Sequence, residues 1–180
     1  MATVIISMVL ALIFVAMDQI TKYCIVAAFG VADSLSLGYE AMKATVSGLD
    51  SIEVIPGVFN FSLVMNDGAA FGAFDEARWL FMTASTIAIL ALVYYIIRYR
   101  PQNKLAVVSL AMIIGGGIGN MIDRIWLGYV IDFLDFCAFP SIWKWTFNVA
   151  DSFVCVGTAL LIIYILFFYK DKDKTEDTKK

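Results

Sequence analysis

Residues 105–124 read LAVVSLAMIIGGGIGNMIDR, an apolar run that ends in the polar side chains Asn120, Asp123 and Arg124. As a helix the apolar part is about 27 Å long at ~1.5 Å per residue, close to the ~30 Å thickness of a membrane's hydrocarbon layer. Gly115 and Gly119 form a G-x-x-x-G pattern, which favours close contact with another helix. The stretch predicts a tightly packed membrane helix with polar groups at one end.

Three further stretches are apolar and long enough to cross a membrane, at 3–29, 79–97 and 147–169. The composition agrees, because 61% of the 180 residues are apolar and 16% are charged, against ~45–50% and ~25% in soluble domains. With 105–122, these stretches predict an all-α membrane protein with four transmembrane helices. We expect one domain over 1–180.

Basic residues indicate the orientation of the helices. Arg98, Arg100 and Lys104 lie between the second and third helices without an acidic neighbour, and the tail 170–180 carries five lysines. Basic connections stay on the cytoplasmic side, so both termini are expected to be cytoplasmic. The first helix lacks a basic segment before Val4 and a small-residue cleavage site, so we expect it to be retained.

The outward-facing connection 30–78 contains a predicted strand. From Phe59 to Met65, apolar and polar residues alternate with a period of two, which is typical of a half-buried strand. The sequence Asn66-Asp67-Gly68 then predicts a turn. We expect 30–78 to form an outer cap, with 31–54 outside the membrane and partly ordered.

The chain has no histidine, and its three cysteines, Cys24, Cys137 and Cys155, are far apart. Ser-His dyads, H-E-x-x-H zinc sites and imidazole relays are therefore excluded. We interpret the cysteines as small apolar side chains and expect no metal and no cofactor. The net charge is −3 without a basic cluster outside the chain end, so no nucleic-acid partner is expected.

Polar residues of three helices lie at one predicted depth. Counted from the cytoplasmic ends at ~1.5 Å per residue, Asp18, Asn120 and Asp151 all lie roughly 22–29 Å along their helices. Residues three or four positions away share the same helix faces: Lys22, Asp123, Arg124 and Asn148. Because ionisable groups in a membrane are costly and by default functional, we expect one polar layer near the outer face.

Several of these residues have structural interpretations. Asp18 and Lys22 are spaced as an ion pair, and Asp123 is a candidate partner for Arg124. Arg124 either extends to the outer headgroups or neutralises nearby carboxylates. Asp135, in an aromatic run, is interpreted as ordinary surface.

Asp132 and Asp151 are harder to explain structurally, because both lie among apolar neighbours without a basic residue nearby. If they meet, the two carboxyl groups share a proton, and the ionised one can activate water, as in aspartic proteases. This chemistry hydrolyses peptide bonds without histidine or metal. Asn148 and Asn66 are candidates for orienting the pair or the substrate.

Five short motifs contain polar residues or glycines: residues 18–22 (DQITK), 66–72 (NDGAAFG), 115–124 (GGGIGNMIDR), 130–133 (VIDF) and 147–152 (FNVADS). They resemble the motifs of the lipoprotein signal peptidases, the type II signal peptidases of bacteria. Each motif alone is weak, but the five occur in the family's order along most of the chain. Departures from the family are a long 31–54 segment, Met65 where members often carry a basic residue, and an extended tail.

The resemblance implies that Asp132 and Asp151 are catalytic. It also implies substrate-orienting roles for Asn66, Asn120, Arg124 and Asn148, and structural roles for Asp18, Lys22 and Asp123. The implied fold has four helices with both termini inside and a small extracytoplasmic β-cradle. The implied reaction removes signal peptides from diacylglyceryl-modified prolipoproteins, just before the lipidated cysteine, in the bacterial inner membrane. We expect the chain to contact membrane lipid and to act as a monomer.

Two other functions fit a membrane bundle with buried charges. A proton-coupled transporter also buries carboxylates, but such proteins carry repeats and bind at the midplane. A non-catalytic scaffold would use the G-x-x-x-G pattern for helix pairing, and its Asp151→Asn variant would change association but no chemistry.

Overall fold

The computed structural model describes residues 1–67, 77–139, 141–143 and 145–169. Its four long helices are α1 (Ala2–Ala28), α3 (Ala77–Tyr99), α4 (Lys104–Trp126) and α5 (Val149–Phe167). Each contains a segment long and apolar enough to span a membrane. The prediction of four membrane helices is confirmed.

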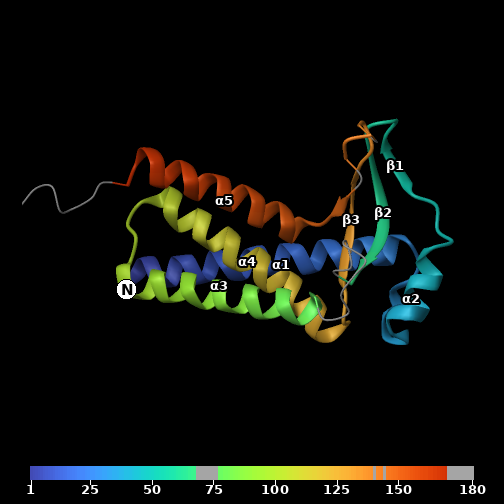
Figure 1. The fold of residues 1–180 in the computed structure, drawn as a ribbon, viewed down its shortest axis with the longest axis horizontal. Helices are drawn as coiled ribbons and strands as arrows, with labels where there is room; N and C mark the ends of the chain where they lie inside the picture. Colours follow the sequence, from blue (N-terminus) through green and yellow to red (C-terminus); the bar gives the residue numbers. More distant parts are fainter. Residues whose placement is uncertain (68–76, 140, 144, 170–180) are drawn as a thin grey trace, which may run out of the picture.

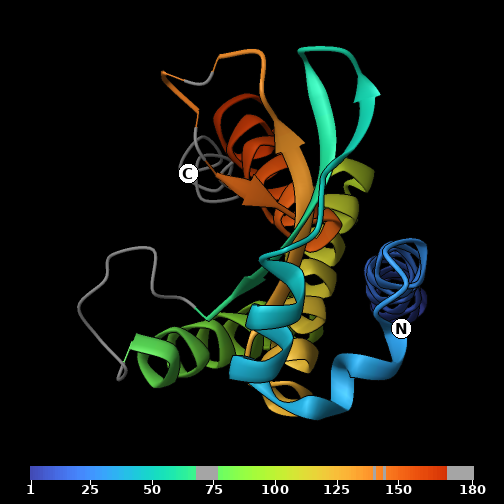
Figure 2. The ribbon, with the colours of Figure 1, turned by 90° about the vertical axis from the view of Figure 1, so that its right-hand side faces the viewer.

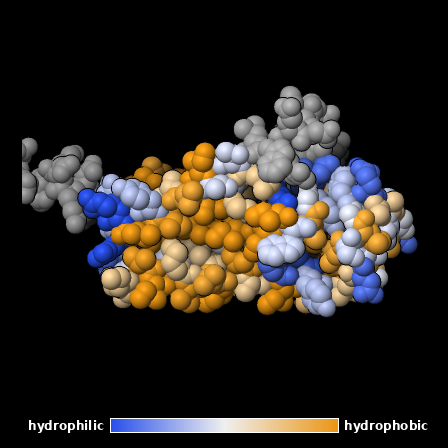
Figure 3. All heavy atoms as spheres, turned by 90° about the horizontal axis from the view of Figure 1, so that it is seen from below, coloured by the Kyte–Doolittle hydropathy of each residue, from blue (hydrophilic) through white to orange (hydrophobic). Residues whose placement is uncertain are grey.

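The four helices run along the long dimension of the molecule (Figure 1). The start of α1, the turn from α3 to α4 and the end of α5 lie together, at what we call the terminal end. A sheet lies at the opposite end, which we call the sheet end. Hydrophobic atoms form a continuous band between the two ends on the face shown in Figure 3, as expected for helices surrounded by lipid.

The helix boundaries differ from the predicted ones where polar groups find partners. α4 continues beyond the predicted end at 122 to Trp126, because the buried Asp123 carboxylate has an ammonium partner, Lys22, at 2.8 Å. α5 begins two residues later than predicted, because Asn148 is its N-cap. The predicted tail 170–180 lies outside the described residues.

α4 packs closely against both α1 and α5. A Cβ atom on Gly115 would lie 2.8 Å from the Ala11 carbonyl oxygen, and one on Gly119 would lie 2.5 Å from Asp18 Oδ2. A Cβ atom on Gly116 would collide with the Ala150 carbonyl oxygen of α5. The close helix contact expected from the G-x-x-x-G pattern is therefore present, and it brings three helices together at the polar end of α4.

The sheet consists of four antiparallel strands in the order β1-β2-β3-β4. They are β1 (Ile52–Ile55), β2 (Phe59–Asn66), β3 (Val130–Phe136) and β4 (Thr146–Phe147). Viewed from the sheet end, the sheet crosses in front of α4 and α5 (Figure 2). The chain is mostly helical, but because of this sheet the all-α prediction is not confirmed.

The predicted strand is present as β2, with the expected alternation. Leu63 and Met65 are buried, whereas Val64 between them is exposed. Val64 lies opposite Asp132 in β3, and Asn66 lies opposite Val130. The predicted turn at 66–68 falls partly on Gly68, outside the described residues.

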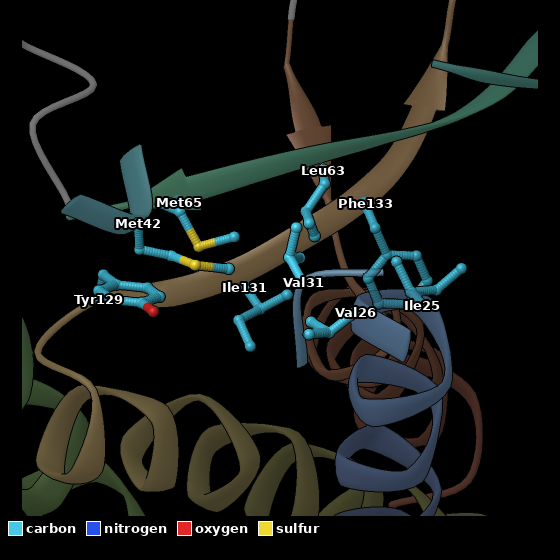
Figure 4. Packing of buried hydrophobic residues seen from close by; sticks show 9 residues of the cluster. All are labelled: Ile25, Val26, Val31, Met42, Leu63, Met65, Tyr129, Ile131 and Phe133. Atoms are coloured by element: carbon cyan, nitrogen blue, oxygen red, sulfur yellow. The ribbon is translucent and has the colours of Figure 1, made fainter. Parts of the chain in front are cut away.

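The segment 31–54 is ordered into η1 (Ala32–Leu37), α2 (Tyr39–Val46) and β1. Met42 of α2 is fully buried under the sheet, in a cluster with side chains of α1, β2 and β3 (Figure 4). The cluster consists of Ile25, Val26, Val31, Met42, Leu63, Met65, Tyr129, Ile131 and Phe133. Each large side chain buried in this way contributes ~1.5–3 kcal/mol, so the cluster fixes β3 to the sheet end of α1.

Candidate active site

Lys22 of α1 is the centre of a buried polar network. Its Nζ atom lies 2.8 Å from Asp18 Oδ2, 2.8 Å from Asp123 Oδ2 and 3.0 Å from Asn120 Oδ1. An ammonium group has three N–H donors, so these three oxygens match its donors. The side chain is 2% exposed. Such a buried cation is tolerated only because it is fully paired.

This network confirms one predicted ion pair and corrects another. Asp18 and Lys22 are paired as expected from their spacing. Asp123, however, pairs with Lys22 instead of Arg124. Consecutive residues of a helix point in different directions, so Asp123 faces α1 while the Arg124 side chain is directed elsewhere.

The carboxylates of the network also hold the first residues of α5 and β3. Asp18 Oδ1 accepts a hydrogen bond of 3.0 Å from the backbone N–H of Ala150, and Asp123 Oδ2 accepts one of 3.1 Å from that of Ile131. Gln19 Nε2 donates to Asp123 Oδ1 at 3.0 Å. These hydrogen bonds fix the start of β3, at Ile131, and the start of α5, at Ala150, relative to α1 and α4.

Asn120 connects this network to Asp151. Its Oδ1 atom accepts from Lys22 Nζ, so its Nδ2 atom points the other way and donates to Asp151 Oδ1 at 2.7 Å. An ammonium group can only donate hydrogen bonds, so Asn120 must turn its amide oxygen toward Lys22 and its amide nitrogen toward Asp151.

Asn148, at the start of α5, contacts both candidate catalytic carboxyl groups. Its Nδ2 atom donates to Asp132 Oδ1 at 2.7 Å and to Asn120 Oδ1 at 2.9 Å. Its backbone N–H donates to Asp151 Oδ2 at 3.2 Å, while its Oδ1 accepts from the backbone N–H of Asp151 at 2.9 Å. The last two bonds form a capping box. The structure therefore brings Asp132 and Asp151 to one residue, as their predicted meeting requires.

Asp132 is almost completely buried, at 1% exposure, in β3. Asn66 Nδ2, on the neighbouring strand β2, donates to Asp132 Oδ2 at 2.7 Å. The pKa of Asp132 is raised to about 7, with burial as the largest cause; the charge of Asp151 also raises it, and the amide donors of Asn66 and Asn148 act in the opposite direction. Asp132 therefore exists in both protonation states near neutral pH.

Arg124 completes the charge balance of the site. Its guanidinium interacts electrostatically with the carboxylates of Asp151, Asp132 and Asp123, most strongly with Asp151. Its Nη1 donates to the Asn120 carbonyl oxygen at 3.3 Å. These interactions favour the neutralising role over extension toward the headgroups.

Other sequence expectations have mixed outcomes. Asp135, interpreted as ordinary surface, accepts a hydrogen bond of 2.7 Å from Ser62 Oγ and so connects β3 to β2. The part of the chain that the structure describes contains no group of three or more His, Cys, Asp or Glu side chains that could hold a metal ion. The place of Gln19 in the polar network was not predicted from the sequence. Its position inside the motif at 18–22 was the only sequence feature that could have indicated this.

The fold and site together define a class: a helical membrane protein with a carboxyl-amide centre buried at one end of its bundle, beneath a small sheet. The family model described as Signal peptidase (SPase) II matches residues 10–167, so the chain belongs to the signal peptidase II family. It is accordingly a membrane protease that removes signal peptides from prolipoproteins. The transporter and scaffold alternatives are not supported.

Individual relatives agree with this assignment. The chain is 38% identical over 164 residues to a lipoprotein signal peptidase of Symbiobacterium thermophilum, covering 89% of this chain and 93% of the relative. It is 43% identical over 120 residues to that of Caldanaerobacter subterraneus, covering 67% and 79%. A solved bacterial membrane enzyme superposes with a TM-score of 0.70 at 32% identity, covering 91% of this chain and 94% of that one.

Proposed function

We propose that the chain is an aspartic endopeptidase, a single domain over 1–180, in which Asp132 and Asp151 activate water. The observation that carries this proposal is the position of Asn148. Its side chain donates to Asp132 and its backbone N–H donates to Asp151. One residue thus contacts both carboxyl groups and brings them into one site, which supports the proposal of a coupled pair.

The two carboxyl groups take different roles at the start of the reaction. Asp132, with its pKa raised to about 7, provides the protonated carboxyl that donates to the carbonyl oxygen of the scissile bond. Asp151, which accepts from Asn120 and interacts with Arg124, provides the carboxylate that takes a proton from water. Two carboxyl groups in different environments are the usual arrangement for such acid–base chemistry.

The steps balance without a metal or a cofactor. The water oxygen bonds to the carbonyl carbon as Asp151 takes one water proton and Asp132 gives its proton to the carbonyl oxygen. The C–N bond of the resulting gem-diol then breaks as Asp151 passes its proton to the leaving nitrogen. Asp132 regains its proton from a hydroxyl of the gem-diol as the new carboxyl group forms. Both residues return to their starting states.

The surrounding residues hold the pair in place. Asn66 positions Asp132, and Asn120 positions Asp151. Arg124 offsets the negative charge that builds up on the carbonyl oxygen as water attacks, before Asp132 has given that oxygen its proton. Asp18, Lys22 and Asp123 form the structural network beneath them, because they hold the ends of α5 and β3 without contacting Asp132 or Asp151 through a hydrogen bond in the described residues.

The proposed substrate is a prolipoprotein whose cysteine already carries diacylglycerol, cut just before that cysteine. The polar centre lies at the sheet end of the bundle, and the basic turn lies at the other end with the start of α1 and the end of α5 (Figure 1). By the positive-inside rule, the termini are cytoplasmic and the site is near the outer face of the bacterial inner membrane. A lipid-anchored cysteine would be held at this depth. We propose that the monomer is active, because both carboxyl groups and all their described partners come from one chain.

The test uses the purified chain and a lipidated lipobox peptide. Asp132→Asn and Asp151→Asn keep side-chain size but remove a titratable oxygen, and each should abolish turnover while substrate binding remains. Asp135→Asn is the matched control, because Asp135 lies in the same strand three residues on and contacts Ser62 instead of the site.

The control should retain most of the activity. Undiminished cleavage by both Asp132→Asn and Asp151→Asn would disprove the dyad. Equal cleavage of a peptide without the diacylglyceryl group would disprove the substrate assignment and leave the dyad intact.

A further inference from the structure

A cavity of about 310 Å³ lies between α3, α4 and α5, away from the candidate active site. It is near the terminal end, because its lining residues Tyr95, Ala106 and Tyr164 lie within about one turn of the helix ends at Tyr99, Lys104 and Phe167. Nothing in the proposed reaction uses this cavity.

The walls of the cavity are apolar apart from phenol groups. Leu92 and Tyr95 come from α3, Ala106 and Leu110 from α4, and Leu161 and Tyr164 from α5. Ala106 and Leu110 are each 1% exposed and form its floor. All three helices are membrane-span candidates, so the medium around the cavity is hydrocarbon. An apolar hollow of this kind does not hold water, whereas a lipid acyl chain matches its walls.

Basic residues lie directly beyond the cavity. Arg98 lies at the end of α3, Arg100 in the turn that follows and Lys104 at the start of α4, without an acidic residue between them; together they are called the basic turn. In the described part of the chain, none of the three takes part in an ion pair. Hydrophilic atoms gather at this end, next to the hydrophobic band (Figure 3).

Ring contacts connect the cavity to this charge. The Tyr95 ring, in the cavity wall, lies 5.1 Å from the Tyr99 ring. The Arg98 guanidinium in turn lies 5.5 Å from the centre of the Tyr99 ring. Tyrosines prefer the level of the lipid headgroups, with the ring in hydrocarbon and the hydroxyl in the polar layer. The cavity therefore leads from hydrocarbon to a cationic headgroup level.

We propose that the cavity and the basic turn form a binding site for an anionic phospholipid. One acyl chain lies between α3 and α5 against α4, and the phosphate lies against Arg98, Arg100 and Lys104. Charge complementarity selects this occupant over a zwitterionic lipid, because each Lys or Arg near an anionic lipid surface contributes about five-fold in affinity.

The first experiment places a fluorescent probe in the cavity. Leu161→Trp puts a tryptophan in its wall, and Ile163→Trp is the matched control on an exposed part of the same helix. Both proteins are reconstituted in phosphatidylcholine vesicles with a minor fraction of lipid brominated on its acyl chains, either phosphatidylglycerol or phosphatidylcholine. The signal of the four native tryptophans, present in both proteins, is subtracted.

Brominated phosphatidylglycerol should quench the cavity tryptophan at least two-fold more than brominated phosphatidylcholine does. The two brominated lipids should quench the control tryptophan equally. Replacing Arg98 and Arg100 together by glutamine removes two charges that contribute about five-fold each, and it should abolish the preference. Replacing both by lysine should preserve it. Equal quenching of the cavity tryptophan by the two lipids, or a preference that survives the glutamine variant, would overturn the proposal.

A second measurement needs no tryptophan in the cavity. Native mass spectrometry of the unsubstituted chain, released from a mixture of the two lipids, should show retained phosphatidylglycerol. The double glutamine variant, which loses two charges that contribute about five-fold each, should retain at least about five-fold less. Equal retention of the two lipids would also overturn the site. Neither experiment reads cleavage, so the lipid site and the proposed peptidase function are tested independently.

Discussion

Replacing Lys22 by methionine should destabilise the protein strongly without touching the two candidate catalytic carboxyl groups. Methionine has nearly the length of lysine but no charge and no N–H donors. The change leaves Asp18 and Asp123, which are 0% and 3% exposed, without their ammonium partner. It also frees Asn120 Oδ1 from its 3.0 Å contact.

The magnitude follows from this geometry. Removing one partner of a buried ion pair costs ~3–5 kcal/mol, because the other charge stays buried without compensation. In a chain of this size 1 kcal/mol corresponds to about 2–4 °C in the melting temperature. Lys22→Met should therefore lower the melting temperature by about 6–20 °C.

The assay is thermal unfolding of the detergent-purified protein. Lys43→Met, at an exposed lysine of α2, is the matched control and should have the same melting temperature as the unsubstituted chain. The double variant Lys22→Met with Asp123→Asn should melt several degrees above Lys22→Met alone, because one stranded charge is removed. A decrease below about 2 °C for Lys22→Met, or a double variant no more stable than the single one, would refute the network.

Two further changes test the site and the packing. Asn66→Ala removes a hydrogen-bond donor that lowers the pKa of Asp132, so that pKa should rise. The alkaline limb of the kcat/KM profile, where Asp132 loses its proton, should then move to higher pH. An alkaline limb at the same or a lower pH would contradict the role of Asp132 as the acid. Gly119→Ala would place a Cβ atom 2.5 Å from Asp18 Oδ2 and should lower the free energy of unfolding by ~1–3 kcal/mol. The control Gly48→Ala, whose Cβ atom meets nothing within 4 Å, should leave it unchanged. Equal melting temperatures of the two variants would contradict the close contact.

The helices and the polar layer could be predicted from the sequence because their signals are local. An apolar run of membrane length has few alternatives to a helix. Residues such as Asn120 and Asp123 share a helix face by spacing alone. The strand β2 was equally readable, because Leu63 and Met65 alternate with less buried residues in the order of a half-buried strand.

What the sequence did not reveal depends on partners far along the chain. Asp123 was assigned to its neighbour Arg124, but Lys22 of another helix is its partner, which only the packing of α1 on α4 decides. The strand β3 reads VIDFLDF, with its two polar residues Asp132 and Asp135 three positions apart, so no alternation with a period of two marked it. Its place follows from pairing with β2 and from the Ile131 N–H bond to Asp123. The ordered segment 31–54 depends likewise on Met42, which is buried by residues of other elements.

The capping box of α5 has a consequence for how this chain can vary in length. Asn148 and Asp151 are held by the first turn of a helix, and Asp132 is held by β2 and by the same Asn148 side chain. The spacing of the two carboxyl groups is therefore independent of the length of the connection between β3 and β4. Insertions or deletions in that connection should be tolerated, whereas a single residue added between Asn148 and Asp151 would separate the pair.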